Sequence, residues 1–204
     1  LAGIEVRAVG FPTDTERPVT LVANHVSWAD IFALNTQRAC HFIAKDELRR
    51  WPVVGRMLAN VGTLFINRSD RKDTHRLKDV VHRLMLEGET VAVFPEGTTS
   101  DGRDVLKFHA SLLEPVVAAG GEVWVVAVRY FRPAPSREVH AEMRTDAAAY
   151  IGDTTMLQSL HAIFAAQPLI AEVRFLEAID CAGRTRREVA QRAQEAIRAV
   201  VRAP

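Results

Sequence analysis

A histidine and an aspartate, His25 and Asp30, stand five residues apart just after a predicted strand. An imidazole can accept a proton through one ring nitrogen while a carboxylate holds the other N–H and fixes the tautomer. On one ideal helix, five residues would leave the two side chains about 140° apart. We therefore expect His25 to precede a helix that Asp30 enters, which would make the pair a candidate general base. The alternative is a polar turn in which Asn24 or Ser27 caps the helix and His25 is only solvated.

Two further strand ends carry polar groups. The predicted strand at 63–66 leads to Arg68, whose guanidinium could bind a phosphate through two parallel hydrogen bonds. The predicted strand at 90–94 leads to Glu96, Gly97 and Thr98. α/β proteins collect ligands at the carboxyl ends of their strands. Each feature alone also fits a surface charge or an ordinary glycine-containing turn.

Strands and helices are predicted to alternate along the chain, as in an α/β domain. We expect a mostly parallel or mixed central sheet flanked by helices. The predicted strands lie near 4–8, 19–23, 40–44, 63–66, 90–94, 123–128, 138–143 and 170–176, and the predicted helices near 72–87, 109–119, 155–166 and 186–200.

Two of the helices have specific signals. In residues 72–87, five apolar residues from Leu77 to Met85 recur at one-face spacing and Gly88 follows as a stop signal. Thr185 and Glu188 form a capping-box pattern before the last apolar stripe, which predicts a terminal amphipathic helix.

The composition indicates one domain covering residues 1–204. The 26 basic residues nearly balance 25 acidic ones and 48% of the residues are hydrophobic, which argues against nucleic-acid binding and disorder. No apolar run reaches the roughly 20 residues that span a bilayer. Because the chain begins at Leu1 within a predicted strand, we expect an N-terminal membrane-anchoring segment to precede it in the natural protein.

The two cysteines, Cys40 and Cys181, have neither a CxxC spacing nor a nearby pair of histidines. We expect two small buried side chains, no disulfide framework and no metal site.

Taken together, the strand-end motifs resemble those of the lysophospholipid acyltransferase family. The likeness is carried by NHVSWAD at 24–30, FINR at 65–68 and FPEGTTS at 94–100, with a weaker fourth element, VVAV, at 125–128. It covers most of the chain and implies a glycerolipid acyltransferase-like domain. Members of this family acylate 1-acylglycerol 3-phosphate to give phosphatidic acid.

The resemblance implies roles for the motif residues. His25 would deprotonate the free hydroxyl of the lysolipid and Asp30 would orient the imidazole. Glu96 would hold Arg68 or an acceptor hydroxyl. The residues expected to bind the acceptor are Arg68, Glu96, Gly97, Thr98, Asn67 and Ser27. The acyl thioester, on coenzyme A or acyl carrier protein, would be a co-substrate, and no cofactor is expected.

Two departures from the family pattern bear on the acceptor. Thr99 stands where the third motif commonly has arginine, and the fourth motif lacks its proline. The stretch FPEGTTSDG with Lys107, Phe108 and SLL at 111–113 is similar to the bacterial branch that acylates lyso-ornithine lipid. That lipid is the alternative acceptor.

A basic and apolar stretch surrounds Arg49, Arg50 and Trp51. Such a patch suits an anionic leaflet, so we expect an enzyme associated with the cytoplasmic face of the bacterial inner membrane. A solvated helix that packs Leu48 and Val53 into the core fits the same residues.

Two other classes of protein remain as alternatives. A thioesterase or lipase could act on the same substrates, but the chain has no GxSxG motif. A lipid-binding protein without catalysis could share the fold, although His25 and Asp30 would then have no chemical role.

Overall fold

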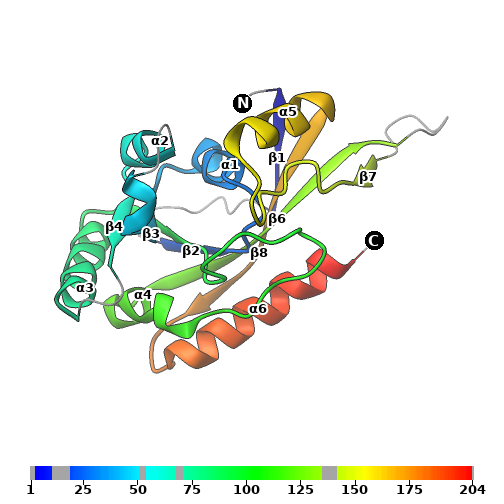
Figure 1. The fold of residues 1–204 in the computed structure, drawn as a ribbon. Helices are drawn as coiled ribbons and strands as arrows, with labels where there is room; N and C mark the ends of the chain where they lie inside the picture. The colour runs from blue at the N-terminus through cyan, green and yellow to red at the C-terminus, as the bar shows by residue number, and fades with distance from the viewer. Residues whose placement is uncertain (1–2, 11–18, 51–53, 68–70, 135–141, 204) are drawn as a thin grey trace.

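The computed structural model describes residues 3–10, 19–50, 54–67, 71–134 and 142–203. It confirms the α/β class and forms one domain with a mixed central sheet flanked by helices (Figure 1). The strands are β1 (Ile4–Val9), β2 (Val19–Ala23), β3 (Cys40–Lys45), β4 (Leu64–Ile66), β5 (Thr90–Val93), β6 (Glu122–Pro133), β7 (Glu142–Arg144) and β8 (Leu169–Asp180). The helices are α1 (Ala29–Gln37), α2 (Val54–Asn60), α3 (Arg71–Leu86), α4 (Glu114–Ala119), α5 (Met156–Ala165) and α6 (Arg186–Arg202), with 3₁₀ turns η1 (Asp46–Arg50) and η2 (Ala110–Leu112).

In the described ranges the sheet has eight strands in the order β1-β8-β6-β2-β5-β3-β4, and β7 pairs with β6. Strands β2, β3, β4 and β5 are parallel to their neighbours, whereas β6 runs antiparallel to β7 and β8. Because β2 and β5 are adjacent and parallel, the loops that follow them leave the sheet at the same edge.

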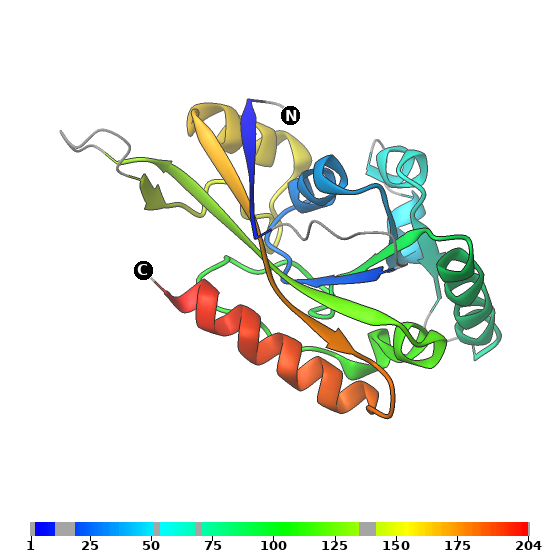
Figure 2. The ribbon, with the colours of Figure 1, turned by 180° about the vertical axis from the view of Figure 1, so that it is seen from behind.

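Helices cover both faces of the sheet. α1, α2 and α5 lie on one face, and α3, α4 and α6 lie on the other (Figure 2). Successive residues of β6 therefore serve two apolar cores: Trp124, Val126 and Val128 face α1, whereas Val123 and Val125 face α6. This period of two places the side chain of Tyr130, further along β6, on the α1 face.

The helix signals are confirmed where they are strongest. α3 matches the expected helix at 72–87 to within a residue, and α6 begins at the predicted capping box, where Thr185 accepts from the N–H of Glu188. The helix expected near 109–119 is instead divided into η2 and α4. Pro115 stands in the first turn of α4, where its missing N–H is tolerated.

Strand lengths were less well predicted. β6 and β8 each have 12 residues, longer than the expected 123–128 and 170–176, because each continues past its apolar run while it pairs with the other. The strand expected at 138–143 corresponds to β7, but residues 135–141 lie outside the described ranges. Cys40 and Cys181 are both free and buried.

Candidate active site

The segments that follow β2 and β5 meet at the predicted edge of the sheet. The backbone N–H of Ser100 donates to the carbonyl of His25 at 2.8 Å. The N–H of Tyr150, from the segment before α5, donates to the carbonyl of Val26 at 2.9 Å. Three parts of the chain thus fix the backbone around His25.

His25 and Asp30 are in direct contact. The Nδ1 atom of His25 lies 2.8 Å from Oδ2 of Asp30, and α1 begins at Ala29, so His25 precedes the helix that Asp30 enters. The predicted juxtaposition of the two side chains is therefore present. The side chain of Asp30 is fully buried, whereas that of His25 keeps 17% exposure.

Asp30 receives hydrogen bonds on both oxygens. The N–H groups of Val26 and Ser27 donate to Oδ2 at 2.7 and 2.9 Å, and the hydroxyl of Tyr130 donates to Oδ1 at 2.6 Å. Hydrogen bonds to an ionised carboxylate stabilise the charge. An anionic Asp30 accepts the Nδ1–H of His25, which leaves Nε2 unprotonated and able to act as a base.

The ring of Phe94 stacks on the imidazole. Their centroids are 4.0 Å apart with planes 10° from parallel, and Phe42 stacks behind Phe94 at 5.7 Å. These rings restrict the orientation of His25, so its Nε2 has a fixed direction.

Glu96 accepts two backbone hydrogen bonds close to His25. The N–H of His25 donates to Oε1 at 2.7 Å and the N–H of Leu106 donates to Oε2 at 2.8 Å. Burial leaves Glu96 only 2% exposed and raises the pKa of its carboxyl to about 7, although both backbone hydrogen bonds oppose that shift. Glu96 thus joins the loop that carries His25 to the loop that carries Leu106, and each of its oxygens accepts a backbone N–H.

Ser27 is another of the residues expected to bind the acceptor. It is fully buried, and its Oγ accepts the N–H of Ala29 at 3.2 Å. The hydroxyl therefore contacts the backbone at the first residue of α1, but it does not cap the helix, whose N-cap residue is Trp28 without a side-chain cap.

Asn24, which the sequence suggested only as a possible helix cap, pairs with a distant strand. Its side chain donates to the carbonyl of Val128 at 2.9 Å and accepts the N–H of Val128 at 2.7 Å. This buried amide ties the His25 loop to β6. Its partner lies 104 residues away, so no local pattern could have revealed the pairing.

A cavity of about 350 Å³ opens beside His25. Gly97, Thr98 and Thr99 line it with His25, and most of the remaining lining is apolar. Gly97 has a φ of 69°, a conformation that suits glycine, and thereby turns the chain along the cavity. The apolar wall includes Trp28, Ile31, Phe42, Leu48, Leu58 and Met156.

Of the other predicted acceptor-binding residues, some line this cavity and others do not. Thr98 is exposed at the cavity, whereas Asn67 is exposed and is not among the residues that line it. The N–H of Asn67 contacts Asp73 at 3.4 Å. Arg68 lies outside the described residues.

Two of the three residues of the predicted membrane patch lie in the described ranges. Arg49 and Arg50 belong to η1 and are exposed. The guanidinium of Arg49 lies 5.9 Å from the ring centroid of Phe65, and Arg50 is 3.7 Å from Asp46. Trp51 lies outside the described residues.

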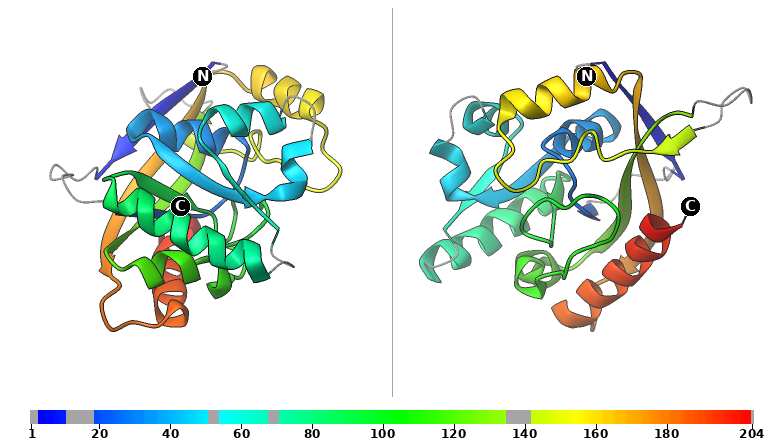
Figure 3. Two further views of the ribbon diagram at one scale, coloured as in Figure 1. Left: turned by 90° about the vertical axis from the view of Figure 1, so that its left-hand side faces the viewer. Right: turned by 45° about the vertical axis from the view of Figure 1, so that its right-hand side comes forward.

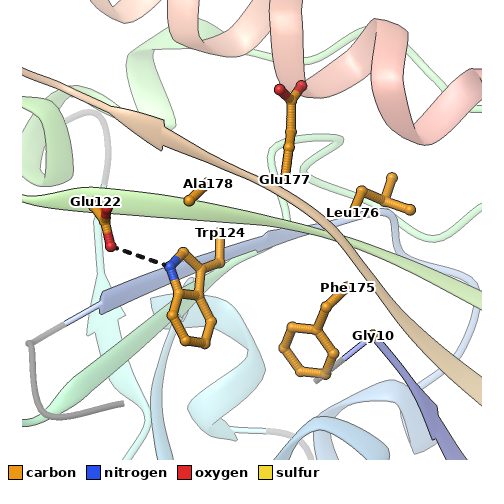
Figure 4. Close-up of a pocket in the computed structure, with 7 residues that line it drawn as sticks. All are labelled: Gly10, Glu122, Trp124, Phe175, Leu176, Glu177 and Ala178. Atoms are coloured by element: carbon orange, nitrogen blue, oxygen red, sulfur yellow. Dashed lines mark hydrogen bonds between the residues drawn. The ribbon is translucent and has the colours of Figure 1, made fainter. Parts of the chain in front are cut away.

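A second cavity, of about 300 Å³, lies away from His25 (Figure 4). Trp124 and Phe175 form its apolar floor with ring centroids 6.2 Å apart, and Glu177 points toward α6. None of the predicted site residues is among the residues that line it.

Two kinds of feature are absent from the described ranges. There, no group of three His, Cys, Asp or Glu side chains is arranged to hold a metal ion. No helix in those ranges combines the length and apolar content needed to cross a bilayer.

Comparison with known proteins gives consistent results. The chain is 37% identical over 184 residues to the 1-acyl-sn-glycerol-3-phosphate acyltransferase of Neisseria gonorrhoeae, covering 90% of this chain and 69% of that protein. It is 35% identical to the lyso-ornithine lipid O-acyltransferase of Pseudomonas aeruginosa, covering 95% and 71%.

A solved structure supports the fold. The crystal structure of the 1-acyl-sn-glycerophosphate acyltransferase from Thermotoga maritima matches with a TM-score of 0.62 at 24% identity, covering 97% of this chain and 71% of that one. The family model named Acyltransferase matches residues 5–130, a range that contains the His25–Asp30 pair and the loop after β5. This chain therefore belongs to the acyltransferase family.

Proposed function

We propose that this enzyme transfers a fatty acyl group from an acyl thioester to the free hydroxyl of 1-acylglycerol 3-phosphate, giving phosphatidic acid. The observation that carries the proposal is the contact of His25 Nδ1 with Asp30 at the rim of a largely apolar cavity. The cavity has room for part of a lipid chain, and the relative at 37% identity bears the name of this activity.

The chemistry needs one general base. His25 Nε2 takes the proton of the acceptor hydroxyl, and the oxygen attacks the thioester carbonyl carbon. The tetrahedral intermediate collapses, the C–S bond breaks, and the thiolate leaves with the proton from His25. Because a thioester is already activated, positioning and one general base, worth about 10²- to 10⁴-fold, supply much of the acceleration. The donor is acyl-CoA or acyl carrier protein, and the proposal includes no cofactor.

Acceptor contacts are assigned to two residues that line the cavity and to Arg68, which is assigned from its motif alone. Thr98 and the backbone at Gly97 lie beside His25, and Arg68 supplies the phosphate contact on the strength of its motif. Arg68→Ala should raise KM for 1-acylglycerol 3-phosphate by about 10-fold or more, since a charge-assisted bidentate contact is lost. An unchanged KM would exclude Arg68 from acceptor binding.

A second acceptor, lyso-ornithine lipid, is favoured by one observation. Thr99 donates its hydroxyl to the carbonyl of Tyr150 where the family commonly has an arginine, and a relative at 35% identity is named for that lipid. The two acceptors are distinguished by incubating the protein with both lysolipids and with each donor, and identifying the products by mass spectrometry. Phosphatidic acid as the main product supports the proposal, and ornithine lipid as the main product replaces it.

The same assay tests the hydrolase alternative. Thioester loss should depend on added lysolipid. Equal loss without lysolipid would make the protein a thioesterase.

We also propose that the enzyme works at the cytoplasmic face of the bacterial inner membrane, where its lipid acceptor resides.

A further inference from the structure

Helix α5 presents apolar side chains to the outside. Leu157 and Phe164 are 78% and 56% exposed, and Ile151, just before the helix, is 43% exposed. Residues seven apart lie on the same side of a helix, so Leu157 and Phe164 share one face. Ser159 and Ile163 are buried, and Ser159 accepts the indole N–H of Trp28 at 2.9 Å. The outward face is thus set by the way α5 packs on Trp28, the residue that precedes α1.

The exposed side of α5 carries no Asp, Glu, Lys or Arg, and its exposed polar side chains are Gln158 and His161. Between Asp153 and Glu172 the sequence has no Asp, Glu, Lys or Arg. A helix that faces water normally carries charged residues on its outer side, as α6 does with Arg187 and Glu195. The large apolar side chains Leu157 and Phe164 therefore dominate the exposed side of α5, with no fully ionised residue type beside them.

The apolar face adjoins the mouth of the catalytic cavity. Gly152 and Met156 line that cavity, and Leu157 follows directly. Glu47 and Leu48 of η1 line the same cavity, next to the exposed Arg49 and Arg50. α5, η1 and α2 lie on the same face of the sheet (Figure 3). The mouth therefore lies between the apolar face of α5 and η1, a turn that carries both acidic and basic side chains. An apolar helix face beside a cavity that receives a lipid suits contact with the interior of a leaflet.

We propose that α5, with Ile151, inserts its outward face into the membrane leaflet that supplies the lysolipid. This inference rests on the proposed function. Insertion would place the cavity mouth at the level of the lipid head groups, so that an acceptor chain enters without crossing water. A second copy of the chain seated on α5 would lie against the same mouth and would hinder that entry.

The test measures binding of the whole chain to vesicles of phosphatidylethanolamine and phosphatidylglycerol. The double variant Leu157→Ser/Phe164→Ser should bind at least about 10-fold more weakly, since two large apolar side chains no longer leave water. The loss should persist at high salt, because it does not depend on charge. Activity on lysolipid presented as dispersed monomers should be unchanged, since neither residue lines the cavity.

Leu86 provides a matched control. It is 75% exposed on α3, which lies on the opposite face of the sheet, so Leu86→Ser should leave vesicle binding unchanged. Unchanged binding of the double variant, or an equal loss with Leu86→Ser, would overturn the inference. If light scattering showed that only the double variant changed oligomeric state while its vesicle binding was retained, α5 would be a subunit interface instead. A parent protein that binds vesicles through α5 but acylates no lysolipid would contradict the proposed function and leave the membrane inference standing.

Discussion

The hydroxyl of Tyr130 on β6 donates a 2.6 Å hydrogen bond to Oδ1 of Asp30, on the carboxylate whose other oxygen holds His25. Complete burial raises the pKa of Tyr130 well above its ordinary value, so this hydroxyl stays a donor throughout the working pH range. Tyr130 acts through Asp30 and is a positioning residue for the base.

Tyr130→Phe should lower kcat by about 10-fold while KM stays within about 2-fold of the parent value, because a hydrogen bond to a charged group is lost and the ring is kept. Steady-state kinetics with a saturating donor would measure both constants. A purely structural role would instead appear as a lower melting temperature with kcat unchanged, and that result would contradict the assignment.

Glu96 should make stability depend on pH. Its folded-state pKa of about 7 exceeds the ordinary value of 4.5, so between these limits the folded protein holds a proton that the unfolded chain has released. The free energy of unfolding should therefore fall as pH rises from about 4.5 to about 7, by up to about 3 kcal/mol, and then level off.

Denaturant unfolding of the parent and of Glu96→Gln across this range measures the effect. The variant cannot titrate, so this component of the pH dependence should disappear. The exposed Glu87→Gln is the control and should retain it. Parallel curves for the parent and Glu96→Gln would show that burial does not shift this carboxyl.

Arg49 and Arg50 should contribute to binding of anionic vesicles. Each cation near such a surface is worth about 1 kcal/mol, so Arg49→Ala/Arg50→Ala should weaken binding by about 10- to 30-fold at low salt. The difference should shrink as salt screens the charges, unlike the effect of the α5 variant. Arg83→Ala/Arg187→Ala, on the exposed surfaces of α3 and α6, is the control. Equal vesicle binding by both double variants would show that Arg49 and Arg50 do not bind the membrane. Adding Trp51→Ala to the first variant would test the third residue of the predicted patch.

The parts of the site that could be predicted from sequence are those set by local geometry. The spacing of His25 and Asp30 admits contact only if the histidine precedes the helix, and the structure has that arrangement. Capping boxes and one-face apolar spacing located α6 and α3 for the same reason, because each depends on residues within a few turns.

The remaining features depend on contacts between distant segments. Tyr130 reaches Asp30 across 100 residues of sequence, and Asn24 reaches Val128 across 104. The sequence indicated that the Glu96 carboxylate could take part in chemistry. Only the structure shows that its two oxygens accept hydrogen bonds from the backbone N–H groups of His25 and Leu106. A polar residue in a motif can bind a substrate or support the loop, and burial decides between them.

The central claim is tested most directly by the rate of lysolipid-dependent thioester consumption in His25→Ala, with the exposed His82→Ala on α3 as the control. The account predicts a fall of about 10²- to 10⁴-fold for His25→Ala, an unchanged melting temperature, and parental activity for His82→Ala. A His25→Ala protein that folds normally and turns over within about 3-fold of the parent rate would contradict it.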